Sequence, residues 1–138
     1  MSGTDPRGVL DTSAVIDLAS LDPASLPDEP VITAITLVKL SVGPLVARTS
    51  EQRAARQAHL QQAEADFDPL PFDASAARAF GRIAASLRSA GRKPSARAYD
   101  ALIAATALAS GLPVYTANPA DFEAIEGLDV RVVKRHLD

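Results

Sequence analysis

The stretch YDALIAATALASGL, residues 99–112, decides the fold. Asp100 is its only charged side chain, and the predicted helix is apolar on every face, so it must be buried. An ionised carboxylate in such a helix requires a cation, a metal ion or a full set of hydrogen bonds. The residues that share the pocket of Asp100 therefore define the candidate functional site.

The composition predicts one compact domain. The chain has 138 residues, of which 47% are hydrophobic, and we expect a flexible segment over 1–7 and a single domain over 8–138. Cysteine is absent, which excludes disulfides and thiolate metal sites. We see no secretory signal and no apolar run long enough to cross a membrane, so the cytoplasm is the expected location. A net charge of -3 argues against a generally basic nucleic-acid binder.

Short apolar runs alternate with helical patterns along the chain. Strands are expected over residues 8–11, 31–35, 113–116 and 130–133. Helices are expected after caps at Thr12 or Ser13, Thr36, Thr49, Asp73, Ser95 and Asn118. Gly111 is expected to end the Asp100 helix. This alternation predicts an α/β domain with a central, mostly parallel β-sheet flanked by helices on both faces.

Carboxylates follow the predicted strands at the edge where ligands of parallel α/β sheets collect. Asp11 ends the first strand, Asp100 lies in the first turns of the apolar helix, and Asn118 and Asp121 follow a late strand. Converging carboxylates repel one another unless a cation lies among them. Their oxygens are ligands that Mg²⁺ and Mn²⁺ prefer, so the pattern favours a nuclease-type metal site, although each residue also fits an ordinary helix-start position.

Hydroxyl and basic side chains accompany these acids. Three hydroxyls are expected either to orient the carboxylates or only to cap helices and strand ends: Thr12, Ser13 and Thr116. Four basic residues flank the predicted turn at Gly91 and either contact an RNA backbone or form a solvated loop: Arg88, Arg92, Lys93 and Arg97. His59 and His136 lack metal-ligand spacing, and both are expected to be solvated.

Lys39 conflicts with the local helix pattern. If Thr36 is the N-cap, Lys39 is the third helical residue, where a capping box has Glu or Gln and where the helix dipole disfavours a cation. Such local inconsistencies concentrate at functional or engineered positions.

Four motifs together resemble the PIN-domain ribonucleases, and among these the VapC toxins of VapBC toxin–antitoxin systems. They are VLDTS at 9–13, ITLVKL at 35–40, DALIAATA at 100–107 and TANPADF at 116–122. The resemblance runs from about residue 8 to 133. It implies a PIN-like fold, a homodimer, and a Mg²⁺- or Mn²⁺-dependent endoribonuclease acting on tRNA or rRNA and inhibited by a VapB antitoxin.

The resemblance also assigns the acidic positions. Asp11 matches the first metal-binding acid and Asp100 the third, while Asn118 or Asp121 matches the fourth. The second acid, normally Glu, falls on Lys39, so the four catalytic positions include a cation and activity is expected to be impaired. The intact neighbouring motif favours an introduced inactivating substitution over a natural loss.

Two other readings remain. A non-catalytic PIN-like module that binds antitoxin or RNA is favoured by Lys39 itself. A phosphoaspartyl site of the receiver or haloacid-dehalogenase type is disfavoured, because no second Asp lies two residues after Asp11.

Overall fold

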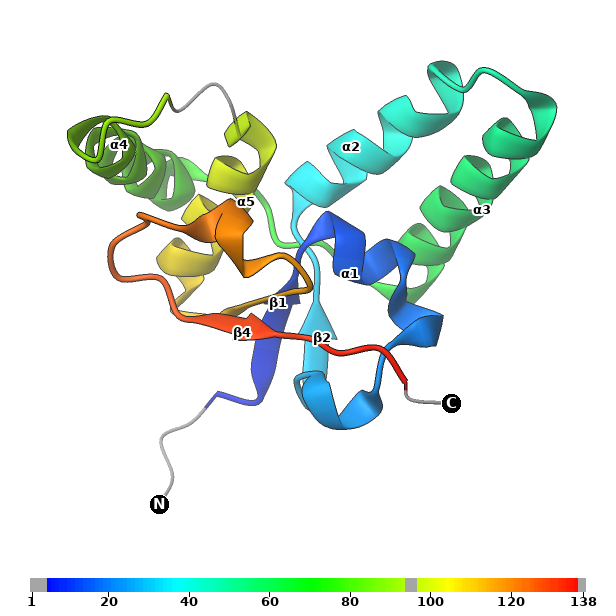
Figure 1. Ribbon diagram of the computed structural model, residues 1–138, viewed down its shortest axis with the longest axis horizontal. Helices are drawn as coiled ribbons and strands as arrows, with labels where there is room; N and C mark the ends of the chain where they lie inside the picture. The colour runs from blue at the N-terminus through cyan, green and yellow to red at the C-terminus, as the bar shows by residue number, and fades with distance from the viewer. Residues whose placement is uncertain (1–4, 94–96, 137–138) are drawn as a thin grey trace.

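The computed structural model describes residues 5–93 and 97–136 (Figure 1). In this part of the chain four parallel strands form one sheet in the order β2-β1-β3-β4. The strands are β1 Arg7–Leu10, β2 Glu29–Val31, β3 Val114–Thr116 and β4 Val130–Val132. The predicted α/β class with a parallel central sheet is therefore confirmed.

Helices cover both faces of the sheet. They are α1 Thr12–Ile16, α2 Ala34–Leu45, α3 Ser50–Asp66, α4 Ala74–Ser89 and α5 Ala98–Ser110, with short 3-10 turns η1 Leu18–Ser20, η2 Pro23–Ser25 and η4 Pro119–Phe122. In Figure 1, α4 and α5 lie on one side of the sheet, whereas α1 and the α2–α3 hairpin lie on the other. No helix in the described ranges has both the length and the apolarity of a membrane span.

Side-chain alternation along β1 and β3 divides the core into two layers. Val9 pairs with Val114, and both side chains pack with α4 and α5. Leu10 pairs with Tyr115, and these side chains face the layer that contains α1, α2 and α3. Because successive strand residues point to opposite faces, a parallel sheet covered on both sides needs apolar residues at consecutive positions.

Local capping signals predicted several helix ends correctly. The Asp73 carboxylate accepts a hydrogen bond from the Ala76 backbone N–H, 3.0 Å away, and starts α4. Thr49 caps α3 in the same way. Gly111 ends α5 with a left-handed backbone at φ 69°, which glycine adopts without steric cost. The predicted cap Ser95 lies outside the described residues.

The start of α2 was predicted three residues too late. Thr33, not Thr36, is its N-cap, and the Thr33 hydroxyl accepts a hydrogen bond from the Thr36 backbone N–H. The Ile32 carbonyl accepts from the Leu70 N–H, 2.9 Å away, so the chain leaves the sheet through a contact with a distant segment. Lys39 is consequently the sixth residue of α2, and the argument that it violates a capping box is wrong.

The first strand, β1, begins at Arg7, one residue earlier than expected. The expected flexible segment 1–7 ends too late, because Arg7 pairs with Glu29 in the sheet and forms an ion pair with Asp5. The α2 helix itself runs through Gly43 and Pro44 to Leu45.

Gly8 lies where β1 passes close to the Tyr115 ring. A Cβ atom built at Gly8 would lie 2.4 Å from Tyr115 Cε1 and 2.8 Å from Pro27 Cβ. We therefore expect Gly8→Ala to lower the free energy of unfolding by about 1–3 kcal/mol, because overpacking a closed core forces side chains from their rotamers. Urea unfolding followed by circular dichroism measures this loss.

The matched control is Gly81→Ala in α4. A Cβ atom at Gly81 has no neighbour within 4 Å, and alanine favours a helix interior over glycine by roughly 0.5–1 kcal/mol. We expect this variant to be more stable than the parent. Equal stability of the two variants would contradict the proposed steric role of Gly8.

Candidate functional site

Asp11 is held rigidly at the end of β1. Its side chain is 3% exposed. The Oδ1 atom accepts hydrogen bonds from the Ser13 hydroxyl at 3.0 Å and the Ala14 backbone N–H at 2.9 Å, and Oδ2 accepts from the Thr116 hydroxyl at 2.6 Å. Asp11 is thus the N-cap of α1, in place of the predicted Thr12 or Ser13. The Ser13 and Thr116 hydroxyls thus hold the Asp11 carboxylate in place.

Thr12 acts on the neighbouring helix instead. Its buried hydroxyl is hydrogen-bonded to the Thr36 hydroxyl, with 3.3 Å between the two oxygens. This contact joins the first turn of α1 to the first turn of α2. It therefore positions the helix that carries Lys39.

Asp100 lies half-buried in the first turn of α5. Burial raises the pKa of its carboxyl above the usual range, and the positive charge of Lys39 opposes this rise. The carboxylates of Asp121 and Asp11 raise the pKa further, and Arg97 lowers it. We call the three acids Asp11, Asp100 and Asp121 the carboxylate cluster, because the charges of Asp11 and Asp121 act on the Asp100 carboxyl.

Lys39 approaches this cluster from α2. Its Nζ atom lies 5.7 Å from the centroid of the Tyr99 ring, next to Asp100 in the chain. The ion pairs found among the described residues do not include Lys39. Its charge therefore acts on Asp100 through space, without a direct ion pair.

Asp121 and Asn118 differ in their surroundings. Asp121 forms an ion pair with Arg97, which starts α5. Asn118 is exposed and sits at the predicted N-cap position of η4 without a side-chain capping bond, while its backbone N–H donates to the Thr116 hydroxyl at 2.9 Å. Because Asp121 influences the Asp100 carboxyl, its charge belongs to the cluster.

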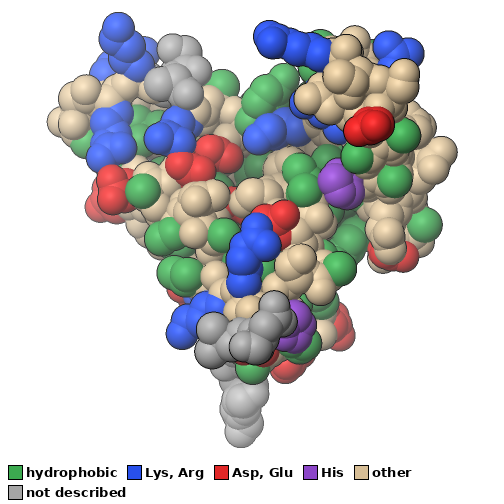
Figure 2. Space-filling model, turned by 45° about the vertical axis from the view of Figure 1, so that its right-hand side comes forward, with side chains coloured by type: hydrophobic (Ala, Val, Ile, Leu, Met, Phe, Trp, Pro, Cys, Tyr) green, Lys and Arg blue, Asp and Glu red, His purple; other side chains and the backbone are tan. Residues whose placement is uncertain are grey.

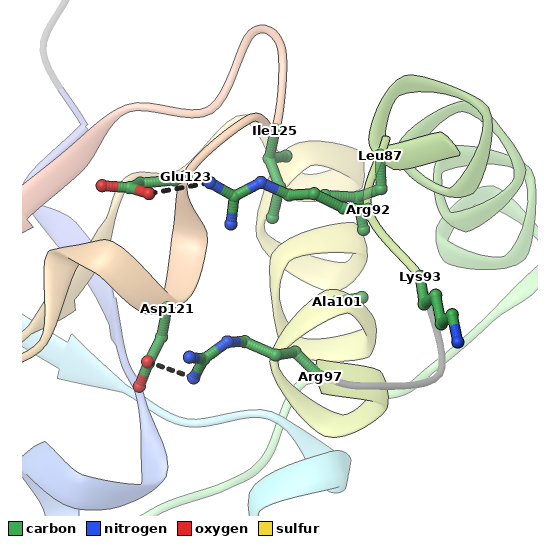
Figure 3. Close-up of a pocket in the computed structure, with 8 residues that line it drawn as sticks. All are labelled: Leu87, Arg92, Lys93, Arg97, Ala101, Asp121, Glu123 and Ile125. Atoms are coloured by element: carbon green, nitrogen blue, oxygen red, sulfur yellow. Dashed lines mark hydrogen bonds and ion pairs between the residues drawn. The ribbon is translucent and has the colours of Figure 1, made fainter. Parts of the chain in front are cut away.

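A cavity of about 270 Å³ adjoins Asp121, and we call it the Arg97 cavity. Its floor is apolar and includes Leu87, Ala101 and Ile125 (Figure 3). Ion pairs of Arg97 with Asp121 and of Arg92 with Glu123 cross its mouth, whereas the Lys93 amine points away from them. Of the four predicted basic residues, Arg88 is exposed in α4 and does not line this cavity.

Sequence reasoning missed two contributors to the site. Glu123 forms an ion pair with Arg92, which lies 31 residues away in the sequence. The Tyr99 ring makes a cation–π contact with the Lys39 ammonium. The TANPADF motif lies near Glu123, but no local spacing links Glu123 to Arg92. The proximity of Tyr99 to Asp100 was the one available signal for the ring.

The donor set was tested against a divalent metal ion. Carboxylate oxygens suit such an ion, but Asp11 is engaged by three hydrogen bonds and Asp121 by Arg97. Within the described ranges no three His, Cys, Asp or Glu side chains are grouped to hold a metal. With the Lys39 ammonium beside Asp100, the residues present do not fit a divalent ion.

Comparison with known proteins identifies the class to which this fold and site belong. Residues 8–128 match the PIN domain. The chain is 43% identical to Ribonuclease VapC5 of Mycobacterium tuberculosis over 92% of this chain and 93% of that protein. It is 30% identical to Ribonuclease VapC1 of Rickettsia felis over 91% of this chain and 95% of that protein.

A solved structure agrees with the sequence relatives. The crystal structure of VapBC-5 from Mycobacterium tuberculosis, a member of the VapBC family of toxin-antitoxin systems, matches with a TM-score of 0.80 and 41% identity, covering 94% of this chain and 99% of that chain. The chain therefore belongs to the PIN-domain family, and within it to the VapC proteins. The resemblance read from the four motifs is confirmed.

Asp100 makes the stability depend on pH. Its raised pKa means that the folded protein holds this proton more tightly than the unfolded chain does. The stabilisation that comes from this protonated carboxyl is fully present below the unfolded pKa of 3.8. It is lost as the pH rises through the folded pKa. We expect Asp100→Asn to raise the melting temperature by a few degrees at pH 7. This gain should shrink toward zero as the pH falls toward the unfolded value of 3.8.

Asp68→Asn is the control, because Asp68 is exposed. Thermal melts of both variants and the parent should be recorded between pH 7 and pH 3.8. A lower melting temperature for Asp100→Asn at pH 7 would mean that the cations stabilise the ionised carboxylate more than burial penalises it.

Proposed function

We propose that this chain is a VapC-type toxin whose site is that of a PIN endoribonuclease and whose hydrolytic step is disabled by Lys39. It binds single-stranded or looped RNA of the tRNA or rRNA class and a VapB-type antitoxin in the cytoplasm, as a homodimer. Family membership supports the nuclease function. The observation that carries the proposed loss of hydrolysis is that the Lys39 ammonium lies over the Tyr99 ring and its charge acts on the Asp100 carboxyl.

Charge explains the loss. The resemblance assigns a glutamate to position 39, so lysine changes the charge of the cluster by two. A divalent ion among Asp11, Asp100 and Asp121 would meet the Lys39 ammonium at close range, and like charges repel strongly in a partly buried site. Lys39 and Arg97 supply the counter-charge that Mg²⁺ or Mn²⁺ would otherwise provide.

RNA binding does not require the missing ligand. The Arg97 cavity combines an apolar floor with arginines at its mouth. Apolar surface accepts a splayed base, and guanidinium groups contact backbone phosphates. We therefore propose Arg92, Lys93, Arg97 and the neighbouring Arg88 as RNA contacts.

The partner surface that we propose is the outer face of α2. Val38, Val42, Leu45 and Val46 are exposed at helical spacing, and an apolar stripe of this kind suits an amphipathic segment of a partner. The structurally similar VapBC-5 protein belongs to a toxin-antitoxin system, which supports an antitoxin as the occupant.

Lys39→Glu is the direct test of the disabled nuclease. We expect calorimetry to detect Mn²⁺ and Mg²⁺ binding at least about a hundredfold tighter than in the parent, because a repelling cation becomes a carboxylate ligand. With either metal, the variant should cleave a mixed structured RNA that the parent leaves intact.

Lys39→Gln is the matched control, since it removes the positive charge without supplying a carboxylate. It should bind metal less tightly than Lys39→Glu and cleave little RNA. Equal metal binding by the parent and Lys39→Glu would place Lys39 outside the metal pocket. Lack of metal binding and cleavage in both variants would instead favour the second candidate, a non-catalytic PIN-like module.

Val42→Lys tests the antitoxin surface. Val42 is 42% exposed at the centre of the α2 stripe. We expect a lysine there to weaken binding of a cognate antitoxin by about tenfold or more, because a desolvated ammonium in an apolar interface lacks a partner. Calorimetry with the purified antitoxin measures the change.

Val132→Lys provides the comparison at a similar exposure, 49%, on β4. This variant should bind the antitoxin as the parent does. Unchanged affinity in Val42→Lys would exclude α2 as the docking surface.

A further inference from the structure

A second cavity, which we call the Lys39 cavity, lies between α1, α2 and α3 and has a volume of about 240 Å³. Basic side chains reach it from two helices: Lys39 from α2, and Arg56 and His59 from α3. Thr12 and Ser13 line it from α1, and the lining contains no Asp or Glu. His59, expected to be solvated, is thus partly buried beside two cations.

The two cations are not neutralised by ion pairs in the described part of the chain. Neither Lys39 nor Arg56 belongs to the ion pairs found there. Arg56 Nη1 donates a hydrogen bond to the Gly43 carbonyl oxygen at 3.0 Å, which anchors the guanidinium. Because a guanidinium has five N–H groups, others remain available for an anion.

The Lys39 cavity adjoins the carboxylate cluster. Ser13, one of its lining residues, donates its hydroxyl to Asp11 Oδ1 at 3.0 Å, and Lys39 influences Asp100. Figure 2 shows a hollow at the top of the molecule with Lys and Arg side chains on both sides of it. Cavities with basic lining residues therefore adjoin the cluster at two places, the Arg97 cavity at Asp121 and the Lys39 cavity at Ser13.

We propose that the Lys39 cavity binds a backbone phosphate of single-stranded RNA. This inference rests on the proposed RNA-binding function and adds a second contact across the carboxylate cluster from the Arg97 cavity. A single-stranded backbone carries a phosphate at every nucleotide, and grooves with basic side chains follow such a backbone. Ile16 and Leu40 add apolar surface for the attached nucleoside.

Proton NMR of the histidine rings provides a local test. The sequence contains only His59 and His136, and His136 does not line the cavity. Inorganic phosphate and a short single-stranded RNA of mixed sequence are each added to the full chain in EDTA at constant pH and ionic strength. We expect both to shift the His59 ring signals and to leave those of His136 in place.

The ligands distinguish the possible sources of the anion. A shift of His59 with phosphate but not with RNA would overturn the RNA assignment in favour of a free-phosphate site. Stronger binding of an oligoglutamate peptide than of RNA would also overturn it, in favour of an acidic protein partner. No shift with either phosphate or RNA would exclude the cavity as an anion site.

Arg56→Gln tests the contribution to RNA affinity. In EDTA we expect this variant to bind the RNA about three- to tenfold more weakly than the parent, with the slope of log affinity against log salt reduced by about 0.7, as for one lost contact to a single strand. Arg82→Gln removes the same charge from an exposed site on α4 and should retain parental affinity and slope.

Arg56→Lys separates charge from structure, because it keeps the cation but loses the guanidinium bond to Gly43. It should retain most of the RNA affinity. An equal loss in Arg56→Lys and Arg56→Gln would assign Arg56 a structural role and overturn its phosphate contact. These measurements omit metal and leave Lys39 unchanged, so they are independent of whether Lys39→Glu restores cleavage.

Discussion

The hydrogen bond between the Thr116 hydroxyl and the buried Asp11 carboxylate is the constraint on which the site depends. It joins the carboxyl ends of β1 and β3, while the other Asp11 oxygen caps α1. A charged, buried carboxylate is stable only when such donors surround it. One side chain therefore sets the start of a helix and the relative positions of two strands, and it brings a negative charge to the edge where α5 also begins.

Side chains of the same chain partly balance the charges around Asp11. Lys39 extends from α2 over Tyr99, and Arg97 pairs with Asp121. Burial still raises the pKa of Asp100, so this balance is incomplete. Lys39 and Arg97 thus neutralise part of the charge of the three carboxylates, which is the electrostatic role of the metal ion in a nuclease site. Further basic side chains line the two cavities that adjoin the cluster, which suits an anionic polymer.

Local rules predicted those parts of the fold that depend on neighbouring residues. The caps Thr49 and Asp73 and the terminator Gly111 act within one helical turn, so their positions were correct. Thr36 was mistaken for the cap because Thr33 and Thr36 carry the same hydroxyl and both precede the apolar helical pattern. Only the hydrogen bond from the Leu70 N–H to the Ile32 carbonyl shows where the chain leaves the sheet. Lys39 consequently remains unusual for its chemistry and not for its place in the helix.

The sequence alone determined the α/β class, the burial of the apolar Asp100 helix and the family, because these follow from hydrophobic periodicity and ordered motifs. It also predicted an acid at the end of the first strand and another in the first turn of the buried helix. Only the tertiary structure decided which cation meets which acid, pairing Arg97 with Asp121 and setting Lys39 over Tyr99. It alone assembled Lys39, Arg56 and His59 around one cavity. Such pairings depend on how whole helices pack, and spacing within a single helix carries no information about its partner.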